Sequence, residues 1–323
     1  MKTHSSKSSR RGFTLVELLV AMAITTIIIL VLVGVTSVAI DTWKRSRSEV
    51  RAASQGKAMI DSMARDLEAM VVRTGNTYQW LHAETPSTKP AVSGSNSKSK
   101  DESQESPNAL NLEFFTSVTD RYMGPLQGGK FGEGIGTSDD LGGDISGVGY
   151  KLVYEDPLTT SGSDYGTFVL RRILVDPNKT YTDLLGKPDL QAAFQSYDSA
   201  ASPAESLVCE NVYQFTVTFL VEISRTSGTT TNKLIVPVTM GSNFVGSLKV
   251  NGDKIDVEEG VQNATVAEIN AGRIVGAQIS LTVLTDFGLE QLRVRPFAND
   301  TDRAKFFAKN SFEYSKMINL PGK

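Results

Sequence analysis

A carboxylate at the start of a long apolar segment is the residue of this sequence that most needs a chemical explanation. Glu17 precedes the run from Leu18 to Ile40, which holds 23 residues and no charge. As a helix this run spans roughly 34 Å, enough to cross the hydrocarbon core of a bilayer. An unpaired carboxylate near the centre of a membrane costs about 2.5–3.5 kcal/mol. Glu17 is therefore either solvated at the membrane interface or paired with a positive group.

Two patterns in the middle of the chain match binding motifs in part. The segment 124–130 has the spacing of a phosphate-binding loop, but Phe131 stands where a hydroxyl must reach Mg²⁺. Asp139, Asp140 and Asp144 offer oxygen ligands for Ca²⁺, but they lack the regular spacing and the closing glutamate of a helix–loop–helix site. A solvated acidic loop is the simpler interpretation. We therefore expect no cofactor and no bound metal.

The residue types needed for catalysis are scarce. Of the two histidines, His4 lies in the basic N-terminal segment, which leaves His82 without a nucleophile motif beside it. This count also excludes a multi-histidine zinc site. Cys209 is the only cysteine, so no intramolecular disulfide can form, and its partly apolar neighbours favour a small core residue over a nucleophile. We predict no catalytic residue and no enzymatic activity.

The residues around Glu17 carry a family resemblance. The sequence Arg-Arg-Gly-Phe-Thr-Leu-Val-Glu ends at Glu17 and leads into the apolar run. It resembles the class III signal of type IV prepilins and of the pseudopilins of type II secretion. The resemblance implies that a prepilin peptidase cleaves between Gly12 and Phe13 and methylates the amine of Phe13. That amine could then pair with Glu17 of a neighbouring subunit during assembly.

The resemblance also decides the orientation in the membrane. A secretory signal peptide has a shorter apolar region and is cleaved after it. Basic residues do not orient the segment, because residues 1–12 and 41–51 carry four each. The resemblance implies a single-pass protein of the bacterial inner membrane, with its N-terminus in the cytoplasm and its C-terminal part in the periplasm. A plain signal anchor remains an alternative, but it leaves the Gly-Phe-x-x-x-Glu arrangement unexplained.

The long helix is predicted to continue beyond the membrane. From Asp41 onward no proline interrupts the pattern, and apolar residues recur at helical spacing between Ile60 and Val71. We predict one helix from about Phe13 to Val72, ended by residues 73–76. Gly34 and Gly56 are its weak points, either tolerated or used in packing.

The domains predicted from these patterns are a leader (1–12), a transmembrane helix (13–40), its continuation (41–73) and a β-rich domain (74–323). Removing the leader changes the formal net charge from −3 to −7, which argues against a nucleic-acid partner.

Within the β-rich domain, two segments read as irregular. Residues 85–108 contain seven serines and three prolines, which predicts a disordered loop. Residues 124–149 contain ten glycines, which predicts a second long loop. Strands are predicted at 110–115, 148–155, 167–175, 212–223, 234–240, 244–250 and 274–284, and short helices within 189–197 and 300–317. Pro237 places its strand at a sheet edge. The predicted fold class is α+β, a long N-terminal helix packed on an antiparallel sheet.

The order of several short segments is similar to that of the J-type minor pseudopilin of type II secretion. These segments are 63–68, 112–116, 149–154, 170–172, 207–212 and 274–285. The similarity implies a structural subunit that supports protein secretion. Its implied partners are the other minor pseudopilins, the major pseudopilin, the prepilin peptidase and the inner-membrane platform. The alternatives are a minor pilin of a type IV pilus, DNA-uptake or other pilin-like system, and a membrane-anchored periplasmic binding or enzymatic domain.

Overall fold

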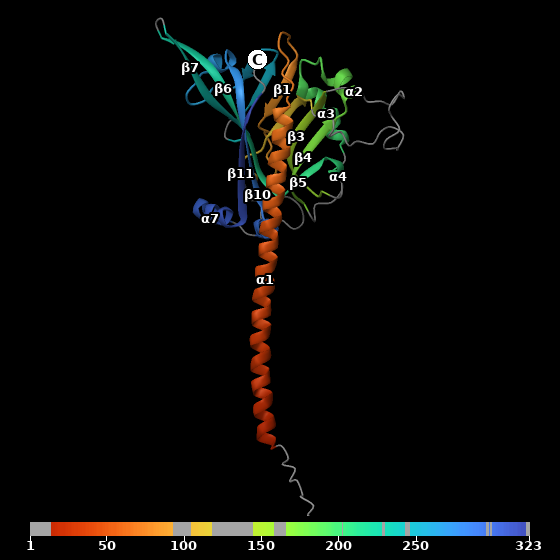
Figure 1. Cartoon of the computed structure of the whole chain (residues 1–323), viewed down its shortest axis with the longest axis vertical. Coiled ribbons are helices and arrows are strands. Elements are labelled where there is room, and N and C mark those ends of the chain that lie inside the picture. Colours follow the sequence, from red (N-terminus) through yellow and green to blue (C-terminus); the bar gives the residue numbers. More distant parts are fainter. Residues whose placement is uncertain are drawn as a thin grey trace, which may run out of the picture. The chain divides into compact units, whose positions relative to one another are not determined.

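The chain forms two compact units, Met1–Glu49 and Val50–Lys323. The computed structural model describes residues 14–92, 105–117, 145–157, 166–201, 203–227, 230–242, 246–294, 297 and 299–320. The predicted leader and Phe13 lie outside the described residues. The first unit is helical, and the second combines helices with two antiparallel sheets (Figure 1). The fold is therefore α+β, as the sequence predicts.

The predicted long helix is α1, Leu15–Glu68, with 54 residues. It ends four residues before the predicted end at Val72. The reason lies in the backbone that follows it: Met70 forms a β-bridge with Thr116, and the N–H of Val71 donates to the carbonyl of Phe115 at 2.8 Å. Pairing with a strand replaces the helical hydrogen bonds, so the predicted helical continuation to residue 73 is too long.

The first sheet has seven strands in the order β5-β4-β3-β2-β1-β8-β9. Their bounds are β1 Gln79–Glu84, β2 Asn111–Thr116, β3 Ser146–Glu155, β4 Thr167–Val175, β5 Leu207–Glu210, β8 Ser247–Asn251 and β9 Lys254–Val257. Every neighbouring pair is antiparallel. The strands β1, β5 and β9 were not predicted, because they are short and lack a long alternating pattern.

The second sheet has four antiparallel strands in the order β11-β10-β6-β7. Their bounds are β6 Val212–Ser227, β7 Thr230–Met240, β10 Arg273–Leu284 and β11 Ser311–Asn319. Pro237 lies in β7 at the edge of this sheet, which confirms the prediction. The strand predicted over 212–223 is β6, and its side chains alternate in burial: Phe215, Val217 and Phe219 are all fully buried.

Short helices complete the second unit. Their bounds are α2 Pro177–Lys179, the π-helix η3 Thr180–Leu184, α3 Leu190–Ala200, α4 Pro203–Ser206, α5 Val266–Asn270, α6 Asp286–Val294 and α7 Asp300–Asn310. The predicted helix after Pro188 is α3, and the side chain of Asp189 caps it by accepting from the N–H of Ala192 at 3.0 Å. α3 packs against β1, β2 and β4 of the seven-stranded sheet.

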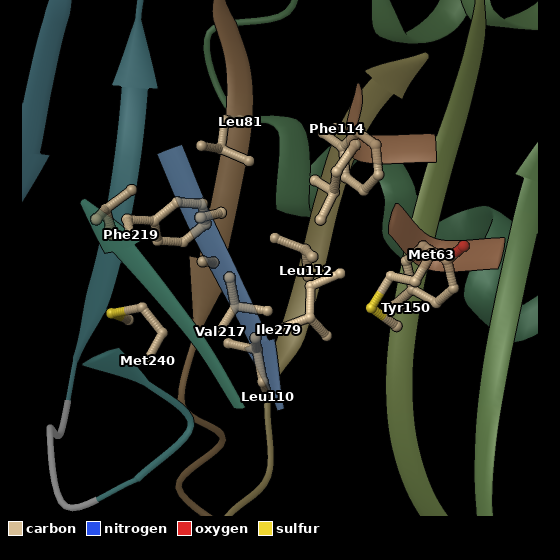
Figure 2. Close-up of a cluster of buried hydrophobic side chains, with 14 of the residues drawn as sticks. Met63, Leu81, Leu110, Leu112, Phe114, Tyr150, Val217, Phe219, Met240 and Ile279 are labelled. Atoms are coloured by element: carbon tan, nitrogen blue, oxygen red, sulfur yellow. The ribbon is translucent and has the colours of Figure 1, made fainter. Parts of the chain in front are cut away.

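One hydrophobic core joins α1 to both sheets. Met63 of α1, Leu112 of β2, Val217 of β6 and Ile279 of β10 are each fully buried in the same cluster. Figure 2 shows Leu112, Val217 and Ile279 close together, with Met63 beside Tyr150 of β3. The C-terminal part of α1 is therefore a core element of the second unit.

The helix predicted over residues 300–317 is correct only in its first part. Asn299 caps α7 by accepting from the N–H of Asp302 at 2.8 Å, and Phe306 is buried. From Ser311 onward the chain instead forms β11, which pairs with β10 over its whole length. Long-range pairing with a strand that was itself predicted decides the conformation here.

The two segments predicted to be irregular have ordered ends. Ala91 bridges Glu105, and the buried hydroxyl of Ser106 donates to the carbonyl of Tyr213 at 2.6 Å. The prediction of disorder is thus wrong for 85–92 and 105–108, whereas 93–104 lie outside the described residues. Likewise 146–149 belong to β3, whereas the rest of the glycine-rich loop up to 144 lies outside the described residues.

Candidate functional site

Thr14 and Glu17 form reciprocal hydrogen bonds that cap the start of α1. The Oε2 atom of Glu17 accepts hydrogen bonds from the Thr14 N–H at 2.9 Å and from the Thr14 hydroxyl at 3.0 Å. In return the N–H of Glu17 donates to Oγ1 of Thr14 at 3.3 Å. This reciprocal arrangement is a capping box, which satisfies backbone donors that a helix start leaves unpaired. Within the described residues, Oε1 of Glu17 makes no hydrogen bond, so one carboxylate oxygen remains available.

The role of Thr14 was missed in the sequence analysis, although its signal was present. A Thr followed three residues later by Glu, ahead of an apolar run, is the sequence pattern of a capping box. Gly12 and Phe13, the predicted cleavage residues, lie outside the described residues, so their geometry is not part of this site.

The first unit exposes its apolar side chains along the whole predicted membrane segment. Leu15 is 77% exposed and Ile40 is 47% exposed. The hydroxyls of Thr25 and Thr26 donate to the carbonyls of Ala21 and Met22, at 2.7 and 2.8 Å. These bonds satisfy the polar groups within the helix, as a lipid environment demands. Among the described residues α1 is the one helix long and apolar enough to cross a membrane.

The second unit holds the C-terminal part of α1 through a buried charged cluster. Asp66 is fully buried, and its Oδ2 atom accepts from the Tyr150 hydroxyl at 2.5 Å and from Nε of Arg172 at 2.8 Å. Burial, together with the negative charge of Asp66, raises the pKa of Tyr150 well above its usual range. Three segments that carried the J-type resemblance, 63–68, 149–154 and 170–172, therefore meet at one cluster. Its role is to fix α1 to β3 and β4.

Close packing and surface ion pairs add to this attachment. A Cβ atom at Gly56 would lie 2.5 Å from the Tyr314 ring of β11, so glycine is required for this approach. The structure therefore supports a role of Gly56 in packing over the interpretation that it is merely tolerated. Nearby, Arg51 contacts Glu210 at 2.8 Å and Asp286 at 3.6 Å, which links α1 to β5 and α6.

The candidate catalytic residues are not arranged as an active site. His82 is fully buried and its Nδ1 atom lies 2.6 Å from Glu113, but no nucleophile joins this pair among the described residues. Cys209 is buried in the core as predicted, and burial raises the pKa of its thiol to about 12, so it is protonated at neutral pH.

Neither binding motif weighed in the sequence analysis can be located in the structure. The described residues contain no cluster of three metal-ligating side chains. The segment 124–130 and the three aspartates Asp139, Asp140 and Asp144 lie outside the described residues.

Comparison with known proteins gives a direct result for the N-terminal segment. Residues 7–33 match the family model of the prokaryotic N-terminal methylation motif. The match includes Gly12, Phe13, Thr14 and Glu17 together with most of the apolar run. The chain thus carries a prepilin-type processing motif ahead of a helix that can cross a membrane.

The remainder of the chain has weaker similarities. No curated protein matches the sequence. Among solved structures, the type IV-like pilin TTHA1219 from Thermus thermophilus shares 11% identity with this chain, covering 84% of this chain and 97% of the pilin with a TM-score of 0.32. An identity and a TM-score this low do not establish a shared function.

Proposed function

We propose that this protein is a structural subunit of a pilus-like fibre, a minor pseudopilin of a type II secretion system. The observation that carries the proposal is the methylation motif over residues 7–33. It begins before the exposed apolar helix and extends into it. A protein that stays in solution has no use for such an arrangement. In a fibre, the apolar surface is covered first by lipid and then by the helices of neighbouring subunits.

The geometry of Glu17 supports a contact between subunits. Cleavage between Gly12 and Phe13 would create a positive amine four residues before Glu17. Oε2 of Glu17 is engaged by Thr14, whereas Oε1 has no partner within the described residues. The Glu17 carboxylate can therefore cap its own helix and also accept a hydrogen bond from the Phe13 amine of a neighbouring subunit. Pairing would also offset the cost of a carboxylate in an apolar environment.

In this proposal the two units have separate tasks. The first unit inserts into the inner membrane with its N-terminus in the cytoplasm and later enters the fibre. The second unit stands in the periplasm and contacts the other minor pseudopilins and the major pseudopilin. The prepilin peptidase processes the chain, and the inner-membrane platform adds it to the fibre.

Mass spectrometry of the mature N-terminus tests the proposal. The expected result is a chain that begins at N-methylated Phe13. A chain that keeps Met1, or one cleaved after the apolar run, would contradict it and favour a membrane-anchored domain that never polymerises.

The same observations also suit a minor pilin of a type IV pilus or a DNA-uptake fibre. A genetic test separates these from secretion: deletion of the gene should abolish release of secreted proteins and leave twitching motility and DNA uptake unchanged. Loss of motility or uptake with normal secretion would favour the pilus instead.

A further inference from the structure

A cavity of about 360 Å³ lies between α3 and the seven-stranded sheet. Glu113 of β2 and Lys151 of β3 line it from the sheet, and Gln195 and Asp198 line it from α3. Gly149 of β3, which is paired with Glu113 of β2, also lines the cavity. This volume falls at the lower end of the range for small-molecule sites in proteins. None of these residues belongs to α1, so the cavity is separate from the assembly proposal.

Two of the three charged residues that line the cavity, Lys151 and Asp198, neutralise each other. Nζ of Lys151 lies 2.6 Å from a carboxylate oxygen of Asp198, which joins the two walls by an ion pair. Glu113 is bonded to the fully buried His82 behind it at 2.6 Å. Burial also raises the pKa of Glu113 above its ordinary value, which favours the neutral form of this carboxyl. Such a lining favours a neutral ligand over an anion or a cation.

The polar groups of the cavity are both donors and acceptors. The carboxamides of Asn111 and Gln195 make no side-chain hydrogen bond within the described part of the chain, and each offers two N–H donors and one carbonyl acceptor. Asp198 and Glu113 add acceptor oxygens, and Lys151 adds donors. A hydroxyl group donates one hydrogen bond and accepts others, so a ligand with several hydroxyls matches this mixture.

We propose that this cavity binds a neutral, hydroxyl-rich ligand of monosaccharide size. Asn111 and Gln195 hold the hydroxyls from opposite walls, and the Lys151–Asp198 pair contributes a donor and an acceptor side by side. The absence of a side chain at Gly149 keeps the cavity open, since a Cβ there would approach the Phe194 ring to 3.4 Å and Cγ of Glu113 to 3.8 Å.

Saturation-transfer NMR on the full-length protein tests this proposal. The protein is kept in dodecylphosphocholine, a detergent without a sugar headgroup that could compete. The probes are D-glucose, D-galactose, D-mannose and N-acetyl-D-glucosamine, with D-glucosamine and D-glucuronate as charged analogues. We expect saturation transfer to at least one neutral sugar and at least tenfold weaker binding of its charged analogues.

Three variants locate the binding. The double variant Asn111→Ala/Gln195→Ala removes the carboxamides, and Gly149→Ala places a methyl group in the cavity; each should weaken binding at least tenfold. Ser196→Ala, next to Gln195 on α3 but outside the cavity, should bind as the wild type does. Thermal unfolding confirms that each variant is folded, and the two cavity variants act by different means, so misfolding of one leaves the other decisive.

Three results would overturn the proposal. The first is that the folded protein transfers no saturation to any neutral sugar. The second is that the cavity variants bind as well as Ser196→Ala does. The third is that a charged analogue binds more strongly than the neutral sugar.

Discussion

Two carboxylates of α1, Asp66 and Glu17, differ in where their partners lie. Asp66 is fully buried and is bonded to Tyr150 and Arg172 of the same chain. Glu17 is exposed, bonds only to Thr14, and keeps one oxygen without a partner among the described residues. The comparison teaches that one helix can serve two purposes. Its C-terminal part is satisfied by folding, whereas its N-terminal part keeps a carboxylate oxygen and an apolar surface that no other described residue covers.

The two glycines of the same helix show the same difference. Gly56 is packed so closely that a Cβ atom would meet the Tyr314 ring. At Gly34 a Cβ would meet nothing within 4 Å. Packing inside the chain therefore explains Gly56, but it does not explain Gly34.

The largest expected effect on stability is that of Asp66→Ala. The change leaves the side chain of Arg172, which is only 12% exposed, without the carboxylate that pairs it. Breaking a buried ion pair in this way costs about 3–5 kcal/mol in the free energy of unfolding. Urea unfolding of the full-length protein in detergent measures the change. Glu68→Ala, two residues away and exposed, is the matched control and should change stability by less than about 0.5 kcal/mol. Similar losses in both variants would contradict the role of the cluster.

A smaller difference in stability is expected between alanine substitutions at Gly56 and at Gly34. Gly56→Ala forces the Tyr314 ring to move, and such overpacking costs about 1–3 kcal/mol, partly offset by about 1 kcal/mol of gained helix propensity. Gly34→Ala should leave the unfolding of the second unit unchanged. Thermal unfolding of both variants, followed by near-ultraviolet circular dichroism, compares them. A stable Gly56→Ala protein, or an equal effect at both positions, would show that packing does not distinguish the two glycines.

A pH dependence should also arise within the second unit. Burial raises the pKa of Glu113 above its ordinary value of 4.5, despite its hydrogen bond with His82. The folded protein then binds more protons than the unfolded chain above this pH. Its stability therefore falls as the pH rises from about 4.5 through the raised pKa, by at most about 1.4 kcal/mol per pH unit.

Urea unfolding between pH 4 and pH 7 measures this slope. Glu113→Gln removes the titration and keeps a hydrogen-bond acceptor for His82, so the slope attributed to Glu113 should disappear. Glu290→Gln, an exposed glutamate of α6, should keep the wild-type slope. An unchanged slope in Glu113→Gln would show that this carboxyl does not cause the pH dependence.

Much of the fold could be predicted from local patterns. The apolar run predicted the start of α1, and a high content of β-branched and aromatic residues predicted β6 and β10. β11 was predicted as helix because the cap at Asn299 and the residues after it favour a helix, and only pairing with β10 stops that helix at Asn310.

The functional residues likewise differ in whether the sequence alone could predict them. Glu17 could be predicted because its motif is contiguous, and Thr14 could have been predicted from its spacing to Glu17. The Asp66 cluster could not, because Tyr150 and Arg172 lie 84 and 106 residues further along the chain. The same holds for the cavity beside Gly149, which exists only once α3 covers the sheet.

The central claim is that the negative charge of Glu17 serves assembly in addition to capping its own helix. Three variants separate these roles. Glu17→Gln keeps an acceptor for the capping box but removes the charge, Glu17→Ala removes both, and Thr14→Ala weakens the cap but keeps the charge. All three should still be cleaved.

Crosslinking in membranes, followed by co-purification with the partner pilins, measures incorporation directly. If the charge pairs with a neighbouring amine, Glu17→Gln should be as defective as Glu17→Ala, with at least a tenfold loss of crosslinked complexes, whereas Thr14→Ala should assemble normally. Normal incorporation of Glu17→Gln together with failure of Thr14→Ala would contradict the claim and reduce Glu17 to a helix cap.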